Sequence, residues 1–156
     1  MTAVALLDSN VVIAMMVLEH PHHAASAALV TGGPVTRFAV AAHSFAEAYN
    51  ILTRQGDRAP YRFAPADAAA ALENLRSVTD LLGLTAARTF EGVRGYARAG
   101  GIGARLYDAL IGEVAVAHGI STIVTWNVAH MSGLFPDLVV ATPISFAEVR
   151  LGDRAP

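Results

Sequence analysis

Short apolar runs alternate with longer helix-like segments along this chain, and this alternation limits the possible fold more than any other feature. The strand-like runs lie at residues 3–7, 35–40, 80–84, 121–125 and 138–141. The helix-like segments lie at residues 10–18, 24–30, 42–53, 67–78, 86–99, 106–118, 127–134 and 143–149. Such alternation predicts an α/β fold, in which helices flank a central, mostly parallel β-sheet.

The chain is of ordinary domain size, with 156 residues. We find no repeat or linker, so we expect one domain over residues 1–150 and a polar C-terminal tail over 151–156. Apolar residues make up 54% of the sequence and charged residues only 15%. A chain of this composition is expected to bury much of its surface or to keep a partner over an exposed apolar patch.

The longest apolar stretches do not predict a membrane span. Residues 3–18 are interrupted by Asp8, and residues 110–126 by Glu113 and His118. Neither stretch supplies the roughly 20 uninterrupted apolar residues that a spanning helix needs. The first residues also lack the basic start of a signal peptide, so we expect a cytoplasmic protein without a membrane partner.

Two residue types are missing from the sequence, and their absence excludes several kinds of site. The chain contains no Cys, which removes thiol nucleophiles and thiolate zinc sites. It also contains no Lys, because all eleven basic residues are Arg, and this excludes a P-loop and a Schiff base. The formal net charge of −2 does not exclude nucleic acid, since eleven Arg remain for phosphate contacts.

Four side chains with oxygen ligands lie at or near the ends of apolar elements: Asp8, Glu47, Asp108 and Asn127. Ends of strands and starts of helices are where open α/β sheets build their sites. Two carboxylates about 5 Å apart repel by roughly 3 kcal/mol at an effective dielectric constant of 20. A cluster of such groups is therefore expected to hold a hard cation such as Mg²⁺ or Mn²⁺.

Each of these residues also has a structural explanation. Asp8 and Asn127 are suited to capping the helices that follow them, and Ser44 with Glu47 matches a capping box. Asp108 differs, because it falls on an apolar helix face where a carboxylate needs a partner. On the same face, Gly112 is expected to leave room for a substrate or an ion.

Two further groups are singled out by charge. Pro21 interrupts a set of histidines, which we interpret as a polar corner because their spacing is not that of a helical zinc pair: His20, His22 and His23. Gly56 and Pro60 break the helix that would align a set of arginines, which we expect in an exposed loop that contacts RNA or a partner: Arg54, Arg58 and Arg62.

His130 lies three residues after Asn127 in the sequence, close enough for its side chain to approach the same site.

Four motifs, taken in order, resemble one known family. They are the segment 6–13 around Asp8, the pair Ala46-Glu47 on a helix, the segment 107–111 around Asp108, and the segment 125–130 around Asn127. Together they resemble the PIN-domain ribonucleases, and most closely the VapC-type toxins of bacterial toxin–antitoxin modules. The similarity covers essentially the full chain.

The resemblance implies a Mg²⁺- or Mn²⁺-dependent endoribonuclease that forms a homodimer and is neutralised by a small VapB-type antitoxin. It implies that Asp8 and Asp108 are the principal metal ligands and that Glu47 is the third acid, which positions or deprotonates a water. Asn127 stands where the family often has an Asp, so we expect one firmly held ion, a second ion that arrives with the substrate, and an amide that orients the water.

Two other functions remain open from the sequence. A PIN-like module that binds RNA or protein without turnover is compatible with Asn127 and with the few basic residues. A small-molecule phosphohydrolase is a weaker alternative, because the segment Asp8-Ser9-Asn10 lacks the second Asp of D-x-D phosphatases.

Overall fold

The computed structural model describes residues 5–31 and 37–152. The strands are β1 (Ala5–Leu7), β2 (Phe38–Ala41), β3 (Asp80–Leu82), β4 (Thr122–Val124) and β5 (Val139–Ala141). The helices are α1 (Ser9–Met16), α2 (His23–Thr31), α3 (Ala42–Thr53), α4 (Pro65–Val78), α5 (Ala86–Arg98), the 3₁₀ turn η1 (Gly103–Arg105), α6 (Leu106–Ala117), α7 (Val128–Leu134) and α8 (Pro143–Gly152). Every strand and helix that the sequence predicts is therefore present.

All five strands run parallel, in the spatial order β3-β2-β1-β4-β5. The chain builds the sheet from β1 outward through β2 to β3, and then returns to the other side of β1 with β4. The boundary between the neighbouring strands β1 and β4 is thus a topological switch point. Open parallel sheets bind their ligands at such points, beyond the carboxyl ends of the strands. Leu7 of β1 pairs there with Val124 of β4.

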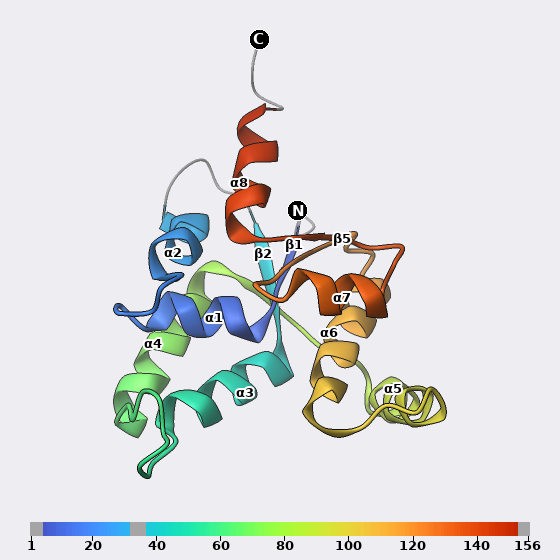
Figure 1. Cartoon of the computed structure of the whole chain (residues 1–156), viewed down its shortest axis with the longest axis horizontal. Coiled ribbons are helices and arrows are strands. Elements are labelled where there is room, and N and C mark those ends of the chain that lie inside the picture. Colours follow the sequence, from blue (N-terminus) through green and yellow to red (C-terminus); the bar gives the residue numbers. More distant parts are fainter. Residues whose placement is uncertain (1–4, 32–36, 153–156) are drawn as a thin grey trace.

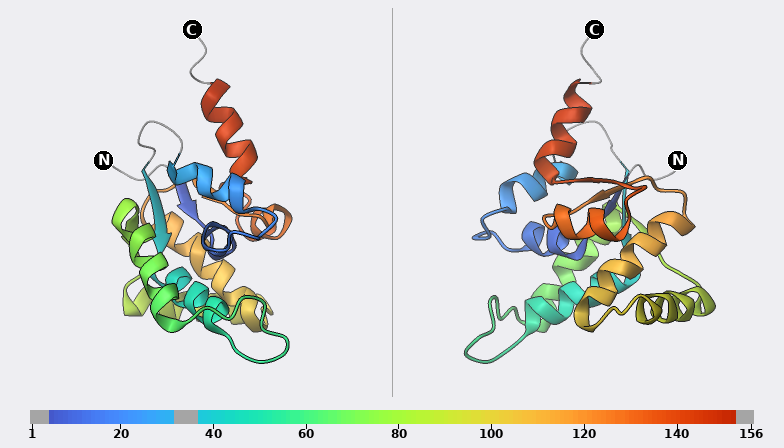
Figure 2. Two further views of the ribbon diagram at one scale, coloured as in Figure 1. Left: turned by 90° about the vertical axis from the view of Figure 1, so that its left-hand side faces the viewer. Right: turned by 45° about the vertical axis from the view of Figure 1, so that its right-hand side comes forward.

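The sheet is covered on both faces, because its strands are apolar at successive positions and send alternate side chains to opposite sides. Ala5 and Leu7 pack in one core with helices α1, α3 and α4. Leu6 and Ile123 pack in a second core with α6 and α7. Figure 1 shows α1 and α6 beside the central strands, with α8 extending away from them. Figure 2 shows the same arrangement from two other sides, with α5 at the outside of the molecule.

The boundaries of some elements differ from those predicted. The predicted starts of the first two strands, at residues 3 and 35, lie outside the described residues, as does the predicted turn at 32–34. Helix α8 continues to Gly152, three residues beyond its predicted end at 149, and residues 153–156 of the expected polar tail lie outside the described part. No helix within 5–31 and 37–152 is long and apolar enough to cross a membrane.

Candidate active site

Asp8 is a buried and firmly held polar side chain at the switch point. It directly follows β1, and its carboxylate caps α1 by accepting a hydrogen bond from the backbone N–H of Ser9 at 2.6 Å. The other carboxylate oxygen accepts a hydrogen bond from the hydroxyl of Thr125 at 2.7 Å. The capping role and the site role predicted for Asp8 are therefore compatible, since one carboxylate has two oxygens. Only 2% of the residue is exposed.

Glu47 reaches the same place from helix α3. The hydroxyl of Ser9 donates to Glu47 Oε1 at 2.8 Å and lies 3.3 Å from Asp8 Oδ1, so Ser9 links the two acids. Glu47 Oε2 is buried and has no hydrogen-bond partner among the described residues. The predicted capping box is wrong: α3 begins directly after β2 with Ala41 as its N-cap, and Ser44 is buried inside the helix.

Asp108 lies in the first turn of α6, and its side chain is about a quarter exposed. His130 of α7 contacts it, with 3.0 Å between the imidazole Nε2 and Asp108 Oδ2. This distance allows an ion pair when the imidazole is protonated, although the contact lacks the geometry of a hydrogen bond. The predicted approach of His130 to the site is confirmed.

Asn127 is placed at the same edge of the sheet but is held only through its backbone. It is the N-cap of α7, yet its side chain makes no capping hydrogen bond and is exposed. Its backbone N–H donates to the Thr125 hydroxyl at 3.0 Å. The amide group is thus free to face solvent or a bound molecule near Asp8.

The three acids share one electrostatic environment. Burial raises the pKa of Asp8 to about 6, and the charges of Asp108 and Glu47 add to that effect. Burial is also the main cause that raises the pKa of Glu47, with Asp108 contributing. Burial raises the pKa of Asp108 as well, against the opposing influence of His130 and Arg105. Ionising all three acids is therefore unfavourable unless a cation lies among them.

The site fits a divalent cation in charge and in donor chemistry, but it is not a closed metal cage. Hard cations such as Mg²⁺ prefer oxygen ligands and keep several waters. Asp8, Glu47 and Asp108 supply such oxygens, and Glu47 Oε2 is buried without a partner. Within the described residues, no three His, Cys, Asp or Glu side chains form a ready-made metal-binding group. Waters or substrate oxygens would have to complete the coordination shell.

The profile of one family, the PIN domain, matches residues 5–128 of the chain, a span that includes Asp8, Glu47, Asp108 and Asn127. The chain belongs to the PIN-domain family. None of the curated proteins matches it by sequence.

Solved structures support the same fold. VapC20 of Mycobacterium tuberculosis, described as a sarcin–ricin loop cleaving toxin, is 18% identical, with a TM-score of 0.59 over 76% of this chain and 86% of that chain. VapBC-1 of nontypeable Haemophilus influenzae is 17% identical, with a TM-score of 0.59 over 90% and 98% of the two chains. VapBC2 of Rickettsia felis, bound to a DNA fragment from its promoter, is 19% identical, with a TM-score of 0.57 over 87% and 96%. The fold is that of VapC-type PIN-domain proteins.

Sequence reasoning missed two polar residues that organise this PIN-domain site. Asn10 accepts a hydrogen bond from the backbone N–H of Trp126 at 3.1 Å and donates to the Thr125 hydroxyl at 3.0 Å. Thr125 in turn donates to Asp8, so these residues fix the ends of β1 and β4 together. The available signal was a Thr directly after a buried strand, at the same edge as Asp8.

The interpretation of Gly112 is wrong. A side chain at this position would overlap the ring of Phe135 from the segment after α7. Gly112 therefore makes room for Phe135, which packs in the second core, and it does not leave space for a substrate or an ion.

Proposed function

We propose that this PIN-domain protein is a Mg²⁺- or Mn²⁺-dependent endoribonuclease that acts as the toxin of a toxin–antitoxin pair. The observation that carries the proposal is the cluster of three electrostatically coupled carboxylates at the switch point of a PIN-domain sheet. The fold shared with VapC20, a protein described as cleaving the sarcin–ricin loop, supports RNA as the substrate.

The three acids divide two roles between them in this proposal. Asp8 and Asp108 hold the cation. A bound Mg²⁺ or Mn²⁺ supplies Lewis acidity toward the scissile phosphate and a water of lowered pKa. Glu47 would position that water or accept its proton, since its Oε2 is buried and has no hydrogen-bond partner among the described residues. Asn127 orients the water through its exposed amide group.

The proposed partners are a VapB-type antitoxin and a second copy of the chain, and the proposed location is the cytoplasm. Several large apolar side chains are exposed, including Phe90 at 62% and Ile102 at 84%. Exposed apolar surface of this kind favours coverage by another protein. Solved complexes named VapBC share the fold, which supports an antitoxin partner.

The first test is cleavage of a structured RNA by the purified protein. We expect cleavage with Mg²⁺ or Mn²⁺, none in EDTA, and none with Asp8→Ala or Asp108→Asn at any metal concentration. Asp137→Asn is the matched control, because Asp137 is exposed and lies in the turn before β5. Unchanged cleavage by both site variants would refute the assigned acids.

A non-catalytic RNA- or protein-binding module is the second candidate. It is favoured by the absence of a ready-made three-ligand group among the residues described and by Asn127 in place of an acid. It predicts that the wild-type protein binds RNA but never cleaves it, whichever divalent metal is added. Release of phosphate from small esters would instead support the phosphohydrolase alternative.

A further inference from the structure

A series of aromatic and imidazole rings leads away from the acid cluster. Trp126 follows Thr125, the residue that donates to Asp8. The His22 ring stacks on Trp126, with centroids 3.8 Å apart and planes 11° apart. His20 lies 5.6 Å from His22, and Tyr61 lies 6.5 Å from His20, both at tilted angles. We call these four residues the ring ladder.

The ring ladder is held in place before any ligand binds. The indole N–H of Trp126 donates to the Ser26 hydroxyl at 3.0 Å, and the backbone N–H of His22 donates to the ring of His20 at 3.0 Å. Tyr61 and Trp126 also pack against the first core while remaining partly exposed. Rings fixed in this way lose little conformational entropy when a ligand stacks on them.

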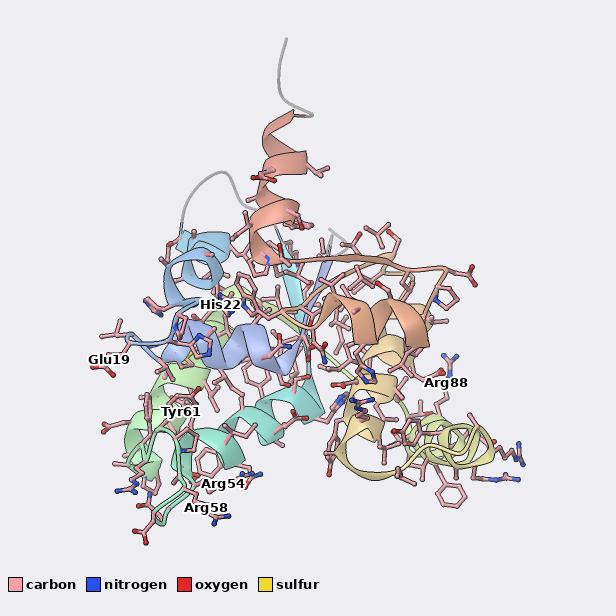
Figure 3. All side chains as sticks on the ribbon, in the orientation of Figure 1. Glu19, His22, Arg54, Arg58, Tyr61 and Arg88 are labelled. Atoms are coloured by element: carbon pink, nitrogen blue, oxygen red, sulfur yellow. The ribbon has the colours of Figure 1, made fainter. Side chains whose placement is uncertain are left out.

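Basic charge lies where the ring ladder ends. Tyr61 belongs to the loop between α3 and α4, which also carries Arg54 and Arg58. Both arginines are exposed, and neither makes an ion pair within the described ranges. Figure 3 shows them on the same side of the molecule as His22 and Tyr61, whereas Arg88 lies on the opposite side.

We infer that the ring ladder is the binding path for single-stranded RNA, whose unpaired bases stack on His22, His20 and Tyr61 while Arg54 and Arg58 contact its phosphates. Sequence-tolerant binding of single strands combines stacking on fixed rings with a basic border, and this face supplies both. Burial and the neighbouring histidines lower the pKa of His20, which favours the neutral form of this ring. This inference rests on the proposed function, because it assigns the RNA path that leads to the acids.

Protein is the other possible occupant, but the observations favour RNA. The ladder consists of aromatic and imidazole rings, and the adjoining loop carries Arg54 and Arg58. The exposed apolar side chains Phe90 and Ile102 belong to α5 and the segment after it, whereas Leu18, which is 80% exposed, lies two residues before His20. If an antitoxin segment covered the ladder instead, the ladder variants would lose affinity for the antitoxin and keep their affinity for RNA.

The test measures binding of a fluorescein-labelled single-stranded 12-mer RNA by anisotropy in EDTA, where no turnover occurs. We expect His22→Ala and Tyr61→Ala each to weaken binding about tenfold, and Tyr61→Phe to bind like wild type. Arg58→Ala should weaken binding and reduce the salt dependence by about 0.7 in log–log slope, whereas the matched control Arg88→Ala should not. A blunt-ended RNA duplex, which has no unpaired bases, should bind equally to wild type and Tyr61→Ala.

A second readout uses the single tryptophan of the chain, Trp126. Since His22 stacks directly on it, RNA on the ring ladder should change Trp126 emission in the wild type and much less in His22→Ala. Circular dichroism should confirm that each variant is folded. Equal affinity of His22→Ala, Tyr61→Ala and Arg88→Ala, or no change in Trp126 emission, would overturn the RNA path.

These experiments distinguish a failure of the RNA path from a failure of the proposed endoribonuclease function. If wild type cleaves RNA and the ladder variants keep its affinity, only the path is wrong. If wild type neither binds nor cleaves RNA, the endoribonuclease proposal fails as well. If the ladder variants lose affinity for an antitoxin and not for RNA, the surface is a protein interface and the RNA path is overturned.

Discussion

At the scale of the residue, Asp8 shows how a site can oppose the stability of its own fold. The carboxylate caps α1 and accepts a hydrogen bond from Thr125, yet burial still raises its pKa to about 6. The folded protein therefore binds this proton more tightly than the unfolded chain does. The contribution of Asp8 to stability is greatest near or below pH 4 and is lost as the pH rises through about 6.

Asp8→Asn should consequently stabilise the protein in EDTA at neutral pH. The pKa is raised from 3.8 to about 6, and each unit corresponds to about 1.4 kcal/mol, so the gain is at most about 3 kcal/mol. Asn keeps an oxygen for the N-cap but places an NH2 group where Asp8 accepts from Thr125, so the measured gain should fall below this limit. Urea unfolding at pH 7.5 and pH 4 measures the effect, which should shrink at the lower pH. Asp137→Asn serves as the exposed control, and a less stable Asp8→Asn protein at both pH values would contradict the argument.

At the scale of the element, local sequence patterns predicted the helices and strands but not every hydrogen-bond partner of their side chains. Alternating apolar runs located all five strands, and Asp8 at the end of the first strand was predicted correctly. The local pattern at Ser44 failed because the chain enters α3 directly from β2. The link from Ser9 to Glu47 joins residues 38 positions apart, so only the packing of α1 against α3 reveals it.

The packing of α6 against the segment after α7 gives a prediction at this scale. Gly112→Ala should destabilise the protein by about 1–3 kcal/mol, because the added methyl group would overlap the Phe135 ring. Gly95→Ala is the matched control: Gly95 lies within α5 with nothing near its added methyl group, so the change should be neutral or stabilise by up to about 1 kcal/mol. Thermal unfolding of both variants measures the difference. Equal changes in melting temperature for the two variants would show that the Phe135 ring can move aside at no cost in stability.

At the scale of the whole molecule, the site exists because four stretches that are separate in the sequence meet at one edge of the sheet. Asp8 follows β1, Thr125 follows β4, Glu47 lies on α3 after β2, Asp108 lies at the start of α6, and His130 lies on α7. From the sequence, Asp8, Glu47 and Asp108 were proposed as members of one site, whereas Thr125 was not. The sequence did not predict the hydrogen bonds among these residues, which depend on the order β2-β1-β4 in the folded sheet.

The same assembly predicts a stabilisation by metal that depends on pH. A bound cation requires ionised carboxylates, and the pKa values of Asp8, Glu47 and Asp108 are all raised. Manganese should therefore raise the melting temperature little at pH 5, where protons compete for Asp8. At pH 7.5 and a concentration 100 times its dissociation constant, it should add about 2.7 kcal/mol. For a chain of this size that corresponds to roughly 5–10 °C.

Differential scanning fluorimetry with and without MnCl₂ at the two pH values measures this response. Asp8→Asn and Asp108→Asn should both lose it, and Asp137→Asn should keep it. Loss in the Asp8 variant together with a higher melting temperature in EDTA would show that one carboxylate both strains the metal-free fold and holds the ion. A manganese response that is equal at both pH values, or that survives in both site variants, would place the ion away from these acids.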